Sequence, residues 1–482
     1  SMDDMAVIPY SLDRAILGTA QLTHFSVKVD QSDHMDTVMA KLERFLGETI
    51  DTSVGEYELE NGNSAMSEST EEMTSMSVVL GGIAGINNGT ITNSAPAESS
   101  SIRGGLDIGG VAGYNSKSGV ITLENASGNV YGITATGGVA GYNKGTIIRC
   151  GDEATVNKMS GYTGSESVDT LCESMNITAH DGYVNWGDNK NIEDLTYNNN
   201  DSVSGKRTRL ILSTKGSLGG ITAYNGPTGK LEYCAAGDWF LNNKSGDISV
   251  GTGGVIGMNE SEQDMKYLVN RAFVGRQLKK ADTNRFAGGI NSTMEGWTLS
   301  HCVNYGMVYG YNSHYCGGII GQWTGSGGNI EECRNYGGLQ TTYTAGWVGA
   351  SAGIVAQLYH AYDGNTYNII GCGNFGSIYG QGGQSYTDSN KKDAAANDSA
   401  GILGNVTTYR RAADQAQRFT IQVLDCVNGP GVEIYSASMA SGIVGFFSMD
   451  DPDNGQNIGN ATGNVQLRIE RCRNFSSRLV GK

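Results

Sequence analysis

The stretch GGIAGINNGTITN, residues 81–93, recurs in close copies as GGVAGYNSKSGVI at 109–121 and GGVAGYNKGTII at 137–148. The central aliphatic residues Ile83, Val111 and Val139 lie 28 positions apart. A fixed period of this length is typical of repeat proteins, in which each repeat forms one structural unit and stacks on the next. The spacing therefore indicates the fold class before any single motif is considered.

The core phrase of this stretch has five positions. They hold a small residue, then glycine, then isoleucine or valine, then any residue, and then a second small residue. Its central residues along the chain are Ile83, Val111, Val139, Ile221, Val255, Ile290, Ile319, Ile354, Ile402 and Ile443, and Ser292 departs from glycine or alanine in the Ile290 copy. A second phrase, C-x-N-x-G, accompanies it at 302–306, 333–337 and 372–376, with degenerate copies at 426–431 and 472–477. We expect about ten coils, one per core phrase, each with three short strands.

Composition agrees with short strands joined by tight turns. Glycine supplies 71 of the 482 residues and proline only 5, which does not fit a disordered Pro/Gly linker. In a stack of coils, the isoleucine or valine of each phrase should form an apolar column. Stacked asparagines should form hydrogen-bonded ladders at the turns. Glycine should permit positive φ at the corners and close approach between coils. We therefore predict a mainly β protein built on a right-handed parallel β-helix, the handedness by analogy with known examples.

Residues 1–77 have a different composition and predict a small α+β unit. Residues 22–30 alternate like a half-buried strand, and Ser32 or Asp33 can begin a helix that ends near Leu46. Residues 56–61 read as a second strand. Open strand edges at the end of a solenoid pair with other chains, so this unit is a candidate N-terminal cap for the β-helix at 78–482.

A gap of 82 residues between Val139 and Ile221 predicts an insertion at about 151–215. The insertion is rich in Asp, Asn and Ser, and its segment TRLILST (208–214) is expected to form a strand of its own.

Two segments resemble known families. VIPYSLDRAILGTAQLTHFSVKV (7–29) and YELENGNSAMSESTEEMTSMSVVLGGIAGI (57–86) are similar to the end of the extracytoplasmic core domain of MacB-like ABC permeases. In that family the last phrase opens a membrane helix, whereas here Asn87-Asn88-Gly89 follows it. The resemblance implies an extracytoplasmic setting; the ATPase and membrane spans of the family are not in this chain.

The repeats over 81–475 resemble the GLUG motif of large bacterial surface and secreted proteins, including the N-terminal regions of some immunoglobulin A proteases. The copies at 81–93, 109–121 and 137–148 are close to the motif, and the later Cys-Asn-Gly copies are looser. This resemblance implies a β-solenoid on a bacterial cell surface, and it carries no catalytic residues to this chain.

Charge and hydropathy exclude some classes of partner. The net charge of −16 makes nucleic acid an unfavourable partner, and no apolar run is long enough for a transmembrane span. The nine cysteines include no C-x-x-C pair and no zinc-type Cys/His spacing. We expect them to be small buried side chains rather than a disulfide set, and we expect no metal and no cofactor.

Catalytic motifs are absent. His301 beside Cys302, and His314 near Cys316, could form a nucleophilic pair, but solenoid strand residues explain both better. A β-helix carbohydrate enzyme would need a pair of acidic residues at a suitable separation. The candidate acids form no recognisable pair in the sequence; they are Asp181, Asp188, Glu193, Glu331, Glu332 and Asp363. DDPDNGQN (450–457) lacks the residue order of a calcium loop and is interpreted as a solvated turn.

Aromatic residues near predicted turns are the candidate ligand-binding set, as a stacking platform for sugar rings or a protein contact: Trp297, Trp323, Trp347, Tyr311, Tyr343 and Tyr359. The leading interpretation is a non-catalytic extracytoplasmic or cell-surface module, a rigid scaffold for adhesion that binds a glycan or a host or bacterial surface protein. The alternatives are a carbohydrate-active β-helix enzyme (lyase, hydrolase or fructotransferase-like) and an accessory part of an ABC export system.

Overall fold

The structure is a computed structural model that describes residues 79–122, 125–159, 162, 167–179, 209–243, 251–275, 284–311, 313–342, 349–361, 364–381, 397–407, 419–448 and 466–481. The chain divides into two compact units, Ser1–Met76 and Ser77–Lys482. The predicted α+β unit lies outside the described residues.

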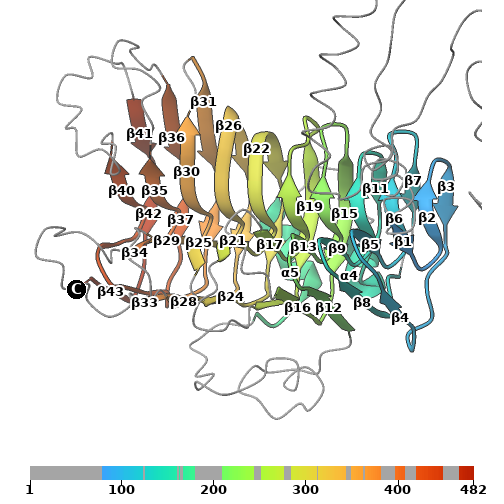
Figure 1. Cartoon of the computed structure of the whole chain (residues 1–482). Coiled ribbons are helices and arrows are strands. Elements are labelled where there is room, and N and C mark those ends of the chain that lie inside the picture. The colour runs from blue at the N-terminus through green and yellow to red at the C-terminus, as the bar shows by residue number, and fades with distance from the viewer. Residues whose placement is uncertain are drawn as a thin grey trace, which may run out of the picture. The chain divides into compact units, whose positions relative to one another are not determined.

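The second unit is a parallel β-helix whose strands form three sheets, here called A, B and C (Figure 1). Every paired strand runs parallel to a strand of the next coil; for example, β6 pairs with β10 and β10 with β14. The chain passes through sheets A, B and C in turn, and this circuit repeats ten times, giving coils 1 to 10. The predicted solenoid and its number of coils are confirmed.

Sheet A contributes one strand to each coil: β1 (Leu80–Gly81), β5 (Asp107–Gly109), β9 (Ala135–Gly137), β13 (Leu218–Gly219), β17 (Gly251–Gly253), β21 (Asn284–Gly288), β25 (Ser313–Gly317), β29 (Gly349–Ala352), β34 (Asn397–Ala400) and β39 (Ala440–Ser441). Sheet C also contributes one: β4 (Ser101–Arg103), β8 (Asn129–Gly132), β12 (Arg209–Ser213), β16 (Trp239–Asn243), β20 (Phe273–Gly275), β24 (Val308–Tyr311), β28 (Leu339–Thr342), β33 (Ile378–Gln381), β38 (Glu433–Ser436) and β43 (Arg478–Val480).

Sheet B contributes two or three strands to each coil, so a coil has four or five strands rather than the three predicted. In coils 1 to 5 they are β2 (Ala84–Asn87), β3 (Thr90–Thr92), β6 (Ala112–Asn115), β7 (Val120–Thr122), β10 (Ala140–Asn143), β11 (Thr146–Ile148), β14 (Thr222–Asn225), β15 (Lys230–Ala236), β18 (Ile256–Asn259) and β19 (Met265–Asn270). In coils 6 to 10 they are β22 (Asn291–Ser300), β23 (Val303–Asn304), β26 (Ile320–Glu331), β27 (Arg334–Asn335), β30 (Val355–Ala361), β31 (Thr366–Ile370), β32 (Gly373–Asn374), β35 (Leu403–Thr407), β36 (Thr420–Leu424), β37 (Val427–Asn428), β40 (Val444–Ser448), β41 (Gln466–Glu470) and β42 (Arg473–Asn474).

The central isoleucine or valine of the core phrase lies at the corner between sheets A and B. From Val111 to Ile402 these side chains are fully buried, whereas Ile83 in coil 1 is 44% exposed. The predicted apolar column is therefore confirmed, and each coil buries the corner residue of its neighbour.

The glycines of the core phrase are required by close backbone approach. A Cβ on Gly110 would lie 2.1 Å from the carbonyl oxygen of Gly138 in the next coil, and one on Gly113 would lie 2.7 Å from that of Asp107 in sheet A. Positive φ was predicted for glycines at the corners. Gly371 adopts it at the corner after β31, whereas no glycine of a core phrase within the described residues does.

Asparagines form two ladders along the solenoid, as predicted. The first links Asn87, Asn115, Asn143, Asn225 and Asn259 in coils 1 to 5. The second links Asn270, Asn304, Asn335, Asn374, Asn428 and Asn474 in coils 5 to 10. In both ladders each Nδ2 donates to the Oδ1 of the following coil at 2.8 Å.

The corner that follows β31 and its equivalents carries a residue with positive φ immediately before the cysteine position. These residues are Arg149, Tyr233, Tyr267, His301, Glu332, Gly371, Asp425 and Arg471. The residue that follows each of them points into the core. Seven of the nine cysteines occupy this position, and Leu268 occupies it in coil 5. All nine thiols are free, and only Cys472 is not fully buried. The left-handed turn thus directs one side chain outward and the next into the core.

In its described residues the insertion contains two helices, α4 (Glu153–Met159) and α5 (Val168–Met175). The strand predicted at 208–214 is present as β12, but it belongs to the solenoid rather than to the insertion, because it pairs in register with β8 and β16 in sheet C. The part of the insertion outside the solenoid is therefore shorter than predicted and ends before Arg209.

Candidate functional site

Among the six predicted aromatic residues, the structure places Trp297 at the surface. Its side chain is 44% exposed, and its backbone has a φ of 62°. Trp323 was predicted to be exposed, and this is wrong: it is fully buried in β26, with Tyr367 edge-on against it at a centroid distance of 5.3 Å. Tyr359 is half-buried in β30.

The other three predicted residues stay a prediction. Tyr343 and Trp347 lie outside the described residues, and Tyr311 ends β24 with its side chain outside the description. Among the three members whose side chains are described, Trp297 is the exposed one.

A column of tyrosines in coils 2 to 4 was missed. Tyr114, Tyr142 and Tyr224 are register partners on neighbouring strands of sheet B, with ring centroids 5.4 and 4.6 Å apart. Each is three residues after the central valine or isoleucine of its core phrase, so the repeat itself carried the signal. Because the rings stack on one another, their edges and hydroxyl groups, rather than their faces, are available to a ligand.

The tyrosine column ends at a pair of carboxylates. Asn259 and Met294 are register partners, so Glu260 and Glu295, which follow them, lie on adjacent coils about 4.8 Å apart in backbone spacing. Burial, and then the nearby Glu260, raise the pKa of Tyr224, whereas burial and the neighbouring Glu260 raise the pKa of Glu295.

Trp297 lies two residues beyond Glu295, where the register between β22 and β26 shifts. Its partner in the next coil is Gly328, in a tip where Gly325, Gly327 and Gly328 all have positive φ. A Cβ on Gly328 would lie 2.2 Å from the Trp297 carbonyl oxygen, so glycine is required there. Glycines at these three positions provide no side chain to cover the indole ring.

Tyr224, Glu260, Glu295 and Trp297 together form what we call the Trp297 corner. An exposed indole can stack on the apolar face of a sugar ring, and carboxylates accept hydrogen bonds from its hydroxyl groups. Two adjacent acids, one with a raised pKa, are also the kind of pair that glycosidases use. The corner thus combines the contacts of a sugar-binding site with a set of acids.

The other candidates from the sequence are partly within the described residues. The Cys302 thiol is buried and donates to the Ser300 carbonyl oxygen at 3.2 Å, while the His301 ring packs on Tyr267 at 5.3 Å. Glu332 lies beside Arg334 at 3.4 Å. The side chain of His314, and the residues Asp181, Asp188, Glu193, Asp363 and 450–457, lie outside the described residues.

The described part of the chain shows neither a metal-binding cluster nor a membrane-spanning helix. Its His, Cys, Asp and Glu side chains form no group of three or more that could hold a metal ion. None of its helices has the length and apolar character needed to cross a membrane.

Comparison of the whole chain with protein-family models, with curated proteins and with solved structures found no match.

Proposed function

We propose that this chain is a non-catalytic binding module of an extracytoplasmic bacterial protein, and that the Trp297 corner binds a glycan. The observation that carries the proposal is Trp297, a large aromatic side chain that is 44% exposed beside a glycine tip and two carboxylates. An aromatic residue left uncovered in a solenoid with a continuous buried core is typical of a contact surface.

The solenoid is suited to a scaffold role because neighbouring coils are held by the same contacts throughout. The buried corner column and the two asparagine ladders join coil to coil along its whole described length. The extracytoplasmic setting rests on the resemblance of the repeats to the GLUG motif. Fractionation of the native organism with an antibody to this chain tests it, and a purely cytoplasmic signal would contradict it.

A glycan array with the purified full chain tests the ligand. We expect binding to one group of glycans, reduced at least about tenfold in Trp297→Ala because the stacking surface is removed. Tyr224→Phe, which removes a hydroxyl group from the corner, should reduce it less. Phe475→Ala removes another exposed aromatic residue, in coil 10, and is the matched control. Binding that is equal in Trp297→Ala and in the control would refute the proposed site.

The Glu260–Glu295 pair favours one alternative, a carbohydrate-active enzyme. An assay for reducing or unsaturated sugar released from the bound glycans distinguishes a binding module from an enzyme. If product forms, and if Glu295→Gln abolishes it while binding is retained, the enzyme would replace the binding module as the proposed function. The export-accessory alternative rests on residues 7–86, nearly all outside the described part, and stays a prediction.

A further inference from the structure

Helix α5 is held against the corner of the solenoid that carries the C-x-N phrase. Its residues Val168, Leu171, Cys172 and Met175 are buried, at the spacing of one face of a helix. They pack on residues of coils 5 to 7, among them Val269, Val303 and Tyr305, with Tyr336 at the edge. The insertion leaves the solenoid at coil 3, but its helix α5 covers the corner of coils 5 to 7.

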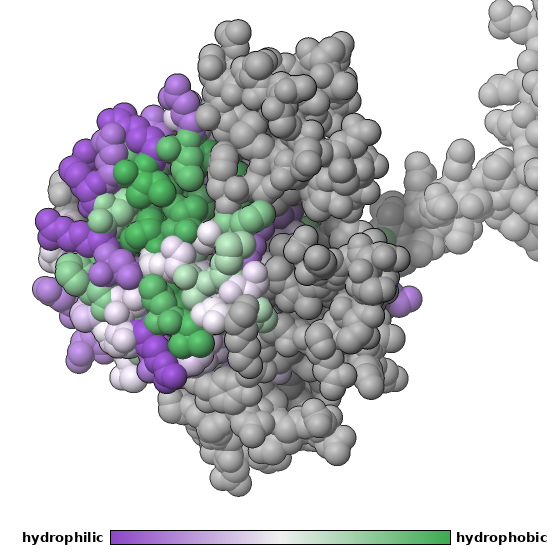
Figure 2. Space-filling model, turned by 90° about the vertical axis from the view of Figure 1, so that its left-hand side faces the viewer, coloured by the Kyte–Doolittle hydropathy of each residue, from purple (hydrophilic) through white to green (hydrophobic). Residues whose placement is uncertain are grey.

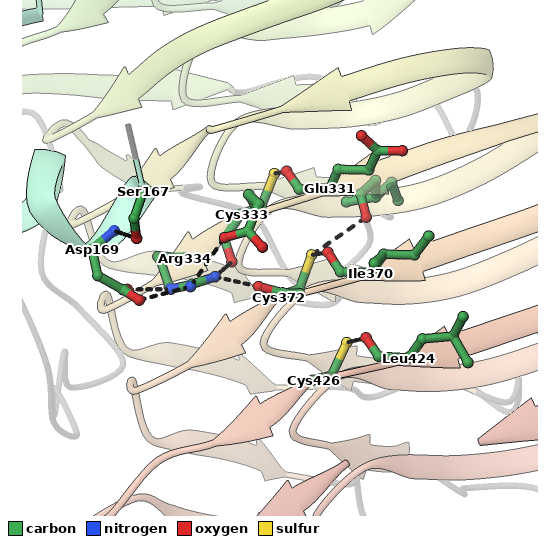
Figure 3. A network of polar contacts seen from close by, with 12 residues as sticks. Ser167, Asp169, Glu331, Cys333, Arg334, Ile370, Cys372, Leu424 and Cys426 are labelled. Carbon is green, nitrogen blue, oxygen red and sulfur yellow. Dashed lines mark hydrogen bonds and ion pairs between the residues drawn. The ribbon is translucent and has the colours of Figure 1, made fainter. Parts of the chain in front are cut away.

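One ion pair fixes the helix on this surface. Asp169, in the first turn of α5, accepts from Arg334 through both carboxylate oxygens, at 2.7 Å from Nε and 3.1 Å from Nη2 (Figure 3). The Ser167 side chain caps the helix by accepting from the Asp169 backbone N–H. Arg334 is the middle residue of the Cys333-Arg334-Asn335 phrase and is largely buried.

The sequence around Arg334 occurs a second time in coil 10. IEECRNYG (330–337) and IERCRNFS (469–476) share isoleucine, glutamate, cysteine, arginine and asparagine in the same order. The two segments also have the same local structure. Glu332 and Arg471 both have positive φ, both cysteine thiols donate to the carbonyl oxygen two residues earlier, and both asparagines belong to the second ladder.

Nothing in the described part of the chain covers the copy in coil 10. Phe475, which corresponds to Tyr336, is 53% exposed, and the Arg473 guanidinium has no ion-pair or hydrogen-bond partner among the described residues. Figure 2 looks onto the end of the solenoid that carries coil 10, where apolar side chains gather beside hydrophilic ones. The exposed large apolar residues of this coil are Met439, Ile469, Phe475 and Leu479.

The surface next to Phe475 continues the one that α5 occupies. Tyr305, Tyr336 and Phe375 stack in consecutive coils at centroid distances of 5.2 and 5.0 Å. Coil 9 then has Gly429, where a Cβ would lie 2.3 Å from the ring of Phe375. Coils 8 to 10 therefore present a shallow apolar strip, from Phe375 across Gly429 to Phe475, with Arg473 at its end.

We propose that this strip binds an amphipathic helix of a partner protein, in the way that coils 5 to 7 bind α5. The partner helix carries an acidic residue in its first turn for Arg473, and apolar residues at positions i, i+3, i+4 and i+7 counted from the residue before that acid. Arg471 stands where coil 7 has Glu332, but its guanidinium is paired with Asp425 and Glu470. Arg473 is therefore the cationic group that this surface offers to an acidic residue of the helix.

A synthetic peptide of residues 164–179 (GSESVDTLCESMNITA) is the probe, with Cys172→Ser against oxidation. Thr170→Glu and Ser174→Lys, at positions that are exposed in α5, allow these two side chains to be joined as a lactam. The lactam is needed because short helices are marginal in water. Fluorescence anisotropy with the full chain should show one saturable site. Arg473→Glu should weaken it at least about tenfold, because a charged hydrogen bond is lost and charges repel.

Controls separate this site from other causes. Arg103→Glu changes an exposed arginine in coil 1 and should leave binding unchanged. The Asp169→Lys peptide should bind weakly to the native chain and recover affinity on Arg473→Glu. Absence of saturable binding, or equal binding to Arg473→Glu and to the native chain, would overturn the proposal. So would a dimer in light scattering that Arg473→Glu dissolves, because the occupant would then be a second copy.

Discussion

Asn259 and Asn270 lie in the same coil, and each ends one of the two asparagine ladders. Asn259 accepts from Asn225, while its own Nδ2 has no hydrogen-bond partner among the described residues. Asn270 begins the other ladder by donating to Asn304 at 2.8 Å. In coil 5 the asparagine link between coils therefore changes from the end of β18 to the end of β19.

Breaking a ladder should destabilise the solenoid. In Asn335→Ala, the Nδ2 of Asn304 and the Oδ1 of Asn374 lose their partner in a buried setting. We expect a loss of about 1–3 kcal/mol in the free energy of unfolding, measured by urea denaturation followed by circular dichroism. Asn88→Ala, at an exposed asparagine next to the first ladder, should change it by less than about 0.5 kcal/mol. Equal effects would show that the ladder does not contribute to stability.

The glycines of the core phrase should not tolerate alanine. A Cβ on Gly138 would lie 2.0 Å from the carbonyl oxygen of Gly220 in the next coil, so these coils would have to separate locally. We expect Gly138→Ala to cost about 3 kcal/mol or more, visible as a lower thermal midpoint. Gly89→Ala is the control, because no atom lies within 4 Å of its Cβ position. A Gly138→Ala protein as stable as this control would contradict the close-approach explanation.

Asp107 should make stability depend on pH. Burial raises the pKa of its carboxyl from 3.8 to about 6, so the native state holds its proton more tightly than the unfolded state does. Its ionised form therefore costs stability above pH 6, and this cost disappears as the pH falls toward 4. Asp107→Asn should be about 1–2 kcal/mol more stable than the native chain at pH 7.5 and equal to it near pH 4.

The pH experiment needs a carboxylate in a different environment as its reference. Asp264→Asn removes an exposed carboxylate and should show no such convergence. A constant difference between Asp107→Asn and the native chain across this pH range would mean that Asp107 is not protonated within it.

One thiol should react in the folded protein. Cys472 is half-buried, and the hydrogen bond from the Cys426 thiol lowers the pKa of Cys472 to about 7, whereas the other eight thiols are buried. With a disulfide reagent at pH 8 we expect one fast equivalent, absent in Cys472→Ser, and the rest only after unfolding. The fast rate should fall severalfold between pH 8 and pH 6. Several fast equivalents in the native state would contradict the buried column.

Much of the fold followed from the repeat, because a parallel solenoid places equivalent residues above one another. The spacing of Ile83, Val111 and Val139 was enough to predict the coils and the buried corner column. The ladders followed from the recurrence of asparagine in both phrases. Close approach between coils was also predicted for the glycines, and it is confirmed at Gly110 and Gly138. The approach of Gly113 to sheet A did not follow, since it depends on how sharply sheets A and B meet.

The aromatic residues show where the prediction of the site failed. Residues three after the central aliphatic residue face outward, as Tyr114 does, and residues four after it face inward. Trp323 is at the inward position, in register with Met294 and Leu358, all of them apolar. This parity could have been read from the repeats. The exposure of Trp297 could not, because it depends on a register shift and on a glycine tip in the next coil.

The two ladders also have a polarity. In each of them the amide of one coil donates toward the C-terminal side and accepts from the N-terminal side, so every internal coil offers its neighbours the same interface. Duplication or deletion of a coil within either series would therefore restore the same asparagine hydrogen bond across the new joint. Coil 5, which accepts at Asn259 and donates at Asn270, is the coil where the two series meet.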